Sequence, residues 1–175
     1  FLCKKKWKLS ISSNFHPERR DASSSASRSR RTPPKPGLVV LFGSGEMSPT
    51  GRKIHEDLFK LAQFQNPVRI GILETPTGFE VNALHSWPER MQAFFESSLK
   101  NFQPQVTRIR AWQRTGKFST NDPKIADQIL NQDYLYAGAG SPTYTVKQLF
   151  ESLAWKRLLE AHKTGTALSV GSATA

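Results

Sequence analysis

Cysteine and long apolar runs are the two features that are scarce in this sequence of 175 residues. Its one cysteine, Cys3, excludes a disulfide or a cysteine-ligated metal site within the chain, which is compatible with a reducing compartment. No apolar stretch approaches the roughly 18 residues that a membrane-spanning helix needs. We therefore expect a soluble, cytoplasmic protein that does not act at a membrane.

Acidic residues are scarce in the first 36 residues, where two of them accompany ten Lys and Arg. This segment holds +8 of the formal net charge of +11, so the remaining chain, at +3, lacks the basic patch of a nucleic-acid-binding domain. Its Ser/Arg-rich and Pro-rich composition predicts a disordered tail at 1–36. Translated upstream sequence, an organellar transit peptide and a nucleic-acid-binding arm are alternative interpretations of this tail.

Residues 37–175 alternate short apolar runs with amphipathic segments. The apolar runs predict five strands, at residues 38–42, 68–73, 106–110, 134–137 and 166–170. Strands that alternate with helices favour right-handed crossovers between parallel neighbours. We therefore predict one α/β domain at 37–175, a three-layer α/β/α sandwich with a mostly parallel sheet.

The apolar patterns of three strands also predict their places in the sheet. The run at 38–42 is apolar throughout, which is typical of a strand buried on both faces, whereas 106–110 alternates and belongs nearer an edge. We expect 166–170 inside the sheet. Because the sequence stops soon after this strand, we also expect an exposed apolar edge near residues 166–175, and hence aggregation or weak folding.

Four helices are predicted between the strands. One begins after Ser48 with Pro49 at its first position, and the next begins after Ser86, which has capping-box spacing to Glu89. A short helix opens at Asp122-Pro123. The fourth follows Ser141-Pro142 and ends near Gly165, and its predicted buried positions are Val146, Leu149, Phe150 and Leu153.

Three loops follow the carboxyl ends of predicted strands, at residues 43–50, 138–142 and 171–173. In an open parallel sheet this edge holds the ligand crevice. Two of the loops contain glycines followed by Ser-Pro-Thr, so each offers free N–H groups and a helix N-terminus to a ligand. The sequence thus predicts a binding crevice at this edge.

A nucleotide site is one alternative for the crevice. Gly43 and Gly45 begin a dinucleotide fingerprint, but its third glycine position is Ser48, and Glu74 is the only residue placed to bind a ribose. A P-loop is excluded because no Gly-Lys-Ser/Thr follows the glycines. The pattern therefore supports a nucleotide site only in part.

Acyl transfer fits the crevice better. Ser172 stands at the end of the last strand, as the serine of a nucleophile elbow does, and the next N–H, that of Ala173, is placed to bind an oxyanion. The small residues Gly138, Ala139 and Gly140 would let a second N–H approach the same oxygen. The alternative is that Ser172 is a polar turn residue.

The order of these motifs resembles the cyanophycinase and dipeptidase E family of serine peptidases, within the class I glutamine amidotransferase-like superfamily. The resemblance covers about residues 37–175 and is based on four segments: Gly43-Ser44-Gly45-Glu46, Gly138-Ala139-Gly140-Ser141-Pro142-Thr143-Tyr144, Ser152-Leu153-Ala154-Trp155 and Gly171-Ser172-Ala173.

The resemblance implies a three-layer α/β fold, cleavage of peptide or isopeptide bonds next to acidic residues, and neither cofactor nor metal. It implies Ser172 as the nucleophile, with Ala173 and Gly140 as oxyanion donors. The small peptide substrate would lie against the remaining crevice residues, which are Gly43, Gly45, Glu46, Gly138, Ala139 and Ser141. A homo-oligomer is also compatible with the sequence.

This sequence departs from the family pattern at the elbow and beyond it. Val170 and Thr174 replace the flanking glycines, and Ser141-Pro142 replaces the Asp-Gln or Asn-Gln that usually follows the glycines of the fourth strand. In the family the histidine base and its acidic partner follow the nucleophile, so we expect a fragment that is inactive as given. The rival hypothesis is a non-catalytic binding module. The four histidines are predicted to be surface or packing residues: His16, His55, His85 and His162.

Overall fold

A computed structural model describes residues 35–172, except for the side chains of residues 81 and 83–85. The described residues belong to one compact unit. The predicted tail at 1–36 therefore lies almost wholly outside the described residues, as does Ala173. Within the part of the chain that is described, no helix is both long and apolar enough to cross a membrane.

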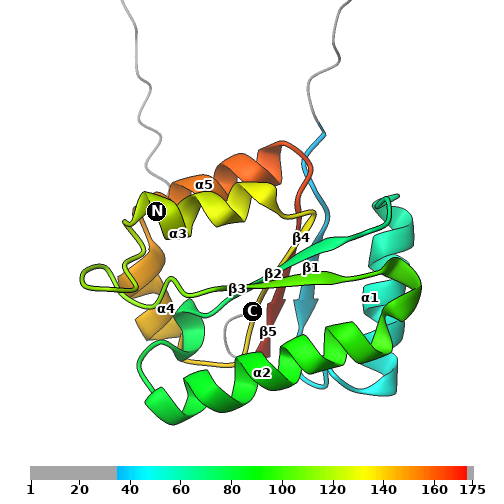
Figure 1. Ribbon diagram of the computed structural model, residues 1–175, viewed down its shortest axis with the longest axis horizontal. Coiled ribbons are helices and arrows are strands. Elements are labelled where there is room, and N and C mark those ends of the chain that lie inside the picture. Colours follow the sequence, from blue (N-terminus) through cyan, green and yellow to red (C-terminus); the bar gives the residue numbers. More distant parts are fainter. Residues whose placement is uncertain (1–34, 173–175) are drawn as a thin grey trace, which may run out of the picture. The chain divides into compact units, whose positions relative to one another are not determined.

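The described unit is built on one sheet of five parallel strands, as the sequence predicts (Figure 1). The order across the sheet is β1-β5-β4-β2-β3, so the last strand lies inside the sheet and the third lies at an edge. Both placements confirm the predictions. The strands are β1 (Val39–Phe42), β2 (Arg69–Leu73), β3 (Gln105–Ile109), β4 (Tyr134–Ala137) and β5 (Ala167–Gly171).

Strand β1 contradicts its prediction of burial on both faces. It forms the second edge of the sheet, and two of its side chains, Val39 and Leu41, are 55% and 65% exposed. Its opposite face is covered, where Phe42 is buried. The apolar surface predicted near 166–175 therefore lies mainly on β1, while Leu168 and Val170 beside it are half-buried.

Three of the four predicted helix starts are confirmed, including that of α4 (Pro142–Leu149) after Ser141, and one is wrong. Helix α1 (Pro49–Leu61) begins after Ser48, whose Oγ accepts from the N–H of Gly51 at 3.0 Å. Helix α3 (Pro123–Ala126) begins after Asp122, and the 3₁₀ helix η3 (Asp127–Asn131) follows it. Helix α2 (Val81–Ser98) begins before Ser86 and contains Pro88, so the predicted capping box is wrong.

The segment predicted as one long fourth helix is two helices, α4 (Pro142–Leu149) and α5 (Leu153–Lys163). The chain breaks because Glu151 has a positive φ of 61° and Ser152 caps the second helix, accepting from the N–H of Trp155 at 3.2 Å. Val146 and Phe150, predicted to be buried, are 63% and 50% exposed. Gly165 follows the end of α5 with a φ of +118°, as predicted for a terminator.

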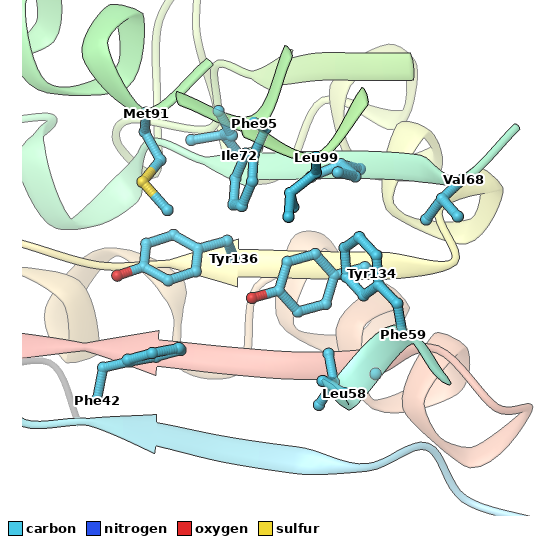
Figure 2. Close-up of a cluster of buried hydrophobic side chains, with 12 residues drawn as sticks. Phe42, Leu58, Phe59, Val68, Ile72, Met91, Phe95, Leu99, Tyr134 and Tyr136 are labelled. Carbon is cyan, nitrogen blue, oxygen red and sulfur yellow. The ribbon is translucent and has the colours of Figure 1, made fainter. Parts of the chain in front are cut away.

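Two cores lie on opposite faces of the sheet and make the three layers that the sequence predicts. The α1/α2 face carries an aromatic core with Phe59, Phe95, Tyr134 and Tyr136 (Figure 2). The α4/α5 face, which α3 and η3 also cover, carries a smaller core that includes Leu135. These two names are used for the faces below.

Candidate active site

The carboxyl ends of three neighbouring strands bring the predicted crevice loops together. Strand β5 lies between β1 and β4, so its end at Gly171 is flanked by the loop after Phe42 and the loop after Ala137. Phe42 pairs with Gly171, and Ala137 pairs with Val170, so the carboxyl ends of β1, β4 and β5 lie at nearly the same level. The adjacency predicted from the α/β pattern is thus present.

Ser172 leaves the sheet in an unusual backbone conformation. Its φ is +58°, in the left-handed region that side chains other than glycine rarely adopt. Such strain is typical of the sharp strand-to-helix turn that presents a nucleophile above a sheet. The side chain is half-buried, and the N–H of Ala173, the first predicted oxyanion donor, lies outside the described residues.

The loop after β4 is pressed against the loop after β2. The N–H of Ser141 donates to the carbonyl of Pro76 at 3.0 Å, and a Cβ atom on Gly140 would collide with that same carbonyl. Gly140 is therefore a glycine because of this close packing. Within the described chain its own N–H donates to no other group, so it is free to bind a ligand oxygen. Ala139 beside it has a φ of +22°.

Two helix N-termini begin at this edge. Ser141 caps α4, and its Oγ accepts from the N–H of Tyr144 at 3.2 Å. Ser48 caps α1 after a turn in which the N–H of Ser48 donates to the carbonyl of Gly45 at 2.9 Å, where φ is +73°. The positive ends of both helix dipoles therefore lie at the edge of the sheet that carries Ser172, where they favour a negative charge.

The loop after β1 contributes a buried carboxylate. Glu46 is only 8% exposed, and its side chain makes no hydrogen bond or ion pair with the described residues. Its negative charge acts on Tyr136, where burial and then this charge raise the pKa of the hydroxyl. Gly43 and Gly45 are exposed, and a side chain on Gly43 would enter open space.

Beneath these loops, the α1/α2 face holds polar groups that the sequence analysis did not connect with the site. The hydroxyl of Tyr136 and the Nε1 of Trp87 are buried and lack hydrogen-bond partners among the described residues. Trp87 stacks on Tyr136 with ring centroids 5.7 Å apart. The one sequence signal for this cluster is Gly138, just after the end of β4, where a side chain would meet the ring of Tyr136.

Neither of the two histidines with described side chains is placed to activate Ser172. His55 is fully buried in the aromatic core, where its Nδ1 lies 2.9 Å from the hydroxyl of Tyr134. Burial lowers the pKa of His55 to about 4, although the backbone of Glu46 acts in the opposite direction. His162 lies at the end of α5, just before β5 begins, and thus at the opposite end of that strand from Ser172. Packing is confirmed as the role of His55.

The described residues do not support a nucleotide site or a metal site. Glu74, the one candidate ribose partner, is fully buried and binds Arg108 Nε at 2.5 Å and Trp112 Nε1 at 2.7 Å. It is therefore not available to a nucleotide. Among the described residues, no three His, Cys, Asp or Glu side chains gather as metal ligands would.

No protein-family model and no curated protein matches this chain. Solved peptidases share its fold. A peptidase from an acI-B1 actinobacterium superposes with a TM-score of 0.63 at 19% identity, over 78% of this chain and 54% of that one. A Listeria monocytogenes EGD-e protein assigned as a peptidase E gives a TM-score of 0.54 at 13% identity, over 80% and 60%. The chain thus spans little more than half the length of these peptidases and has their α/β fold.

Proposed function

We propose that this chain carries the nucleophile and the oxyanion-binding loops of a serine peptidase, with Ser172 as the nucleophile. The observation that carries the proposal is the φ of +58° at Ser172, directly after a central strand. A serine in an ordinary turn could relax to a negative φ, whereas an elbow has to hold the strain in order to lift the hydroxyl clear of the sheet.

The loop after β4 supports the proposal from the other side of the elbow. Gly140 offers an N–H without a partner in the described chain, and α4 begins two residues later with its positive dipole end at the same place. One oxyanion donor contributes about 3 kcal/mol in well-studied hydrolases. In this proposal Gly140 supplies one donor and Ala173 the other.

For the substrate, we propose a small peptide or isopeptide, bound against the loop that carries Gly43, Gly45 and Glu46. The fold shared with two peptidases supports a bond of this class. The cyanophycinase or dipeptidase E specificity that the sequence motifs imply belongs to the same proposal. The proposal also includes a general base that lies outside residues 1–175. Two observations support this: the chain spans 54% and 60% of the two peptidases, and neither histidine with a described side chain lies at the proposed elbow.

Covalent labelling with a fluorophosphonate tests this proposal, because the reagent reacts only with an activated serine. We expect the intact protein to be labelled at Ser172, and labelling to be lost in Ser172→Ala. Ser97→Ala is the matched control, since Ser97 is an exposed serine on helix α2. The chain 1–175 alone should react at least about 100-fold more slowly, because it lacks the proposed base.

The rival is a non-catalytic binding module that keeps the crevice. Val170 favours the rival, since a β-branched residue two positions before the serine crowds an elbow. Labelling of the intact protein that is absent, or that persists in Ser172→Ala, would decide for the rival. Ser172 would then be a strained turn residue without a nucleophilic role.

A further inference from the structure

Tyr136 is held in one orientation by the aromatic core of the α1/α2 face. It is fully buried, and Figure 2 shows its hydroxyl directed toward the carboxyl ends of the strands, the edge that carries Ser172. Trp87 stacks on its ring at 5.7 Å with an interplanar angle of 24°. Three further rings have centroids within about 6 Å of it, those of Phe42, His55 and Phe95.

The register of the sheet places this hydroxyl under the elbow. Tyr136 pairs with Ser169 across β4 and β5, so Gly171 is its diagonal neighbour on the same face. A Cβ atom on Gly171 would overlap the hydroxyl oxygen of Tyr136, whereas ring carbon Cζ would be 3.1 Å away. A Cβ atom on Gly138 would lie 2.7 Å from the same oxygen. The oxygen therefore excludes a side chain at Gly171, whereas at Gly138 the ring itself also excludes one, because its Cε1 would lie 2.6 Å from the added Cβ.

Packing alone does not account for that oxygen. Among the described residues the hydroxyl has no hydrogen-bond partner, and a buried donor without a partner destabilises the folded state. A phenylalanine ring would fill the same space without this loss. Burial, followed by the charge of Glu46, raises the pKa of Tyr136, so the hydroxyl keeps its proton and is a donor at neutral pH.

We infer that Tyr136 is a positioning residue for the nucleophile elbow. Its hydroxyl forms the floor on which Gly171 rests, and it is the hydrogen-bond donor available to the turn that presents Ser172. The height of the serine above the sheet is thus set by a side chain of the neighbouring strand. This inference rests on the proposed function, because it concerns the geometry of Ser172 as a nucleophile.

The test compares labelling rate with stability in the intact protein. Tyr136→Phe removes only the hydroxyl, so we expect fluorophosphonate labelling to slow at least about fivefold while the unfolding midpoint stays constant or rises. Tyr134→Phe is the matched control. Tyr134 is also buried on this face of β4, but its hydroxyl bonds His55 at 2.9 Å, so its loss should lower the midpoint and leave the labelling rate unchanged.

A double substitution tests the contact itself. Gly171→Ala alone should abolish labelling and lower the unfolding midpoint, because the new methyl group meets the hydroxyl oxygen. Adding Tyr136→Phe removes that oxygen and leaves Cζ at 3.1 Å, so both labelling and midpoint should recover in part. If Tyr136 were only structural, Tyr136→Phe could not slow labelling while remaining as stable as the wild-type protein.

The possible failures are distinguishable. Wild-type labelling at Ser172 combined with an unchanged rate in Tyr136→Phe overturns the positioning role and leaves the proposed function standing. A double variant that recovers nothing overturns the floor contact. Wild-type protein that is not labelled at Ser172 overturns the proposed function and this inference together.

Discussion

The two faces of the sheet differ in what they bury and in how completely they are covered. On the α1/α2 face, Phe95, Tyr134 and Tyr136 are fully buried together with the polar His55. On the α4/α5 face, a groove of about 370 Å³ lies between the two helices and strands β2, β4 and β5, and beyond it Leu41 of β1 is 65% exposed. The α1/α2 face therefore covers its strand side chains more completely than the α4/α5 face does.

This difference explains where the strained turn at Ser172 finds its support. Strained and unpaired groups persist only where the surrounding packing over-determines them. Ser172 follows β5, and the buried ring of Tyr136 lies beneath Gly171 on the α1/α2 face. The open face exposes apolar area instead, which gives little stability until something covers it. Substitutions on each face test this contrast.

The largest effect on stability should come from removing an aromatic ring from the α1/α2 face. Phe95→Ala empties a fully buried position that contacts His55, Tyr134 and Tyr136, so we expect the free energy of unfolding to fall by about 3–5 kcal/mol. Phe150→Ala is the matched change on the open face. Because Phe150 is 50% exposed, its loss should be about 1 kcal/mol or less. Urea unfolding followed by tryptophan fluorescence measures both, and equal losses would remove the contrast.

The buried ion pair of Glu74 with Arg108 should contribute more to stability than an exposed ion pair does. Glu74 is fully buried against Arg108, which also reaches Glu89 of helix α2, so Glu74→Gln should destabilise the protein by about 3 kcal/mol. The matched pair is Arg69 with Asp133, where the side chains are 51% and 24% exposed. Asp133→Asn should cost less than about 1 kcal/mol, because water already screens that pair. Denaturant titrations of both variants give the comparison, which fails if the two losses match.

The buried imidazole predicts a loss of stability in acid. The pKa of His55 is lowered from 6.5 to about 4, so between these values only the unfolded chain takes up the proton. Stability should therefore be unaffected above pH 6.5 and should fall with decreasing pH, by about 3 kcal/mol at pH 4. His55→Phe should lack this part of the slope. Unfolding free energies of both proteins at pH 7, 5.5 and 4.5 measure the difference, and parallel curves would contradict it.

The strands could be predicted from the sequence because their signal is local. Short apolar runs bounded by turns locate all five, and Pro49, Pro123 and Pro142 mark three helix starts that the structure confirms. The capping box at Ser86 is equally local, yet the helix begins at Val81. Glu89, which that pattern would assign to the cap, instead reaches Arg108 at 3.3 Å. A tertiary ion pair thus uses a residue that the local pattern assigns elsewhere.

The break between α4 and α5 also depends on distant residues. The last carbonyls of α4 are bound from outside the helix: Arg114 Nε donates to Lys147 at 2.8 Å, and Thr120 Oγ1 donates to Gln148 at 2.9 Å. Helical periodicity contains no trace of these bonds. The candidate site also has a part that the sequence predicts and a part that it does not. Ser172 can be recognised as a serine after a strand, whereas the contact of Tyr136 with Gly171 depends on the register of two strands.

The smallest effect should come from Leu41, on the open side of β1. Leu41→Ser should change the free energy of unfolding by no more than about 0.5 kcal/mol, because a side chain that is 65% exposed loses little burial. It should also raise the concentration at which the protein aggregates, which light scattering measures. Leu135→Ser is the matched control on the same face. Leu135 is 3% exposed and packs in the core of the α4/α5 face, so its loss should cost several kcal/mol, about 3 or more.

Equal losses at Leu41 and Leu135 would mean that the exposed side of β1 is covered in solution. A covered β1 would then resemble the strand buried on both faces that its unbroken apolar run predicts. Dependence of the Leu41→Ser effect on protein concentration would identify a second copy as the cover, since association strengthens with concentration. A loss that is large at every concentration would instead place the cover within the same polypeptide, and the contrast between the two faces would belong to the described residues alone.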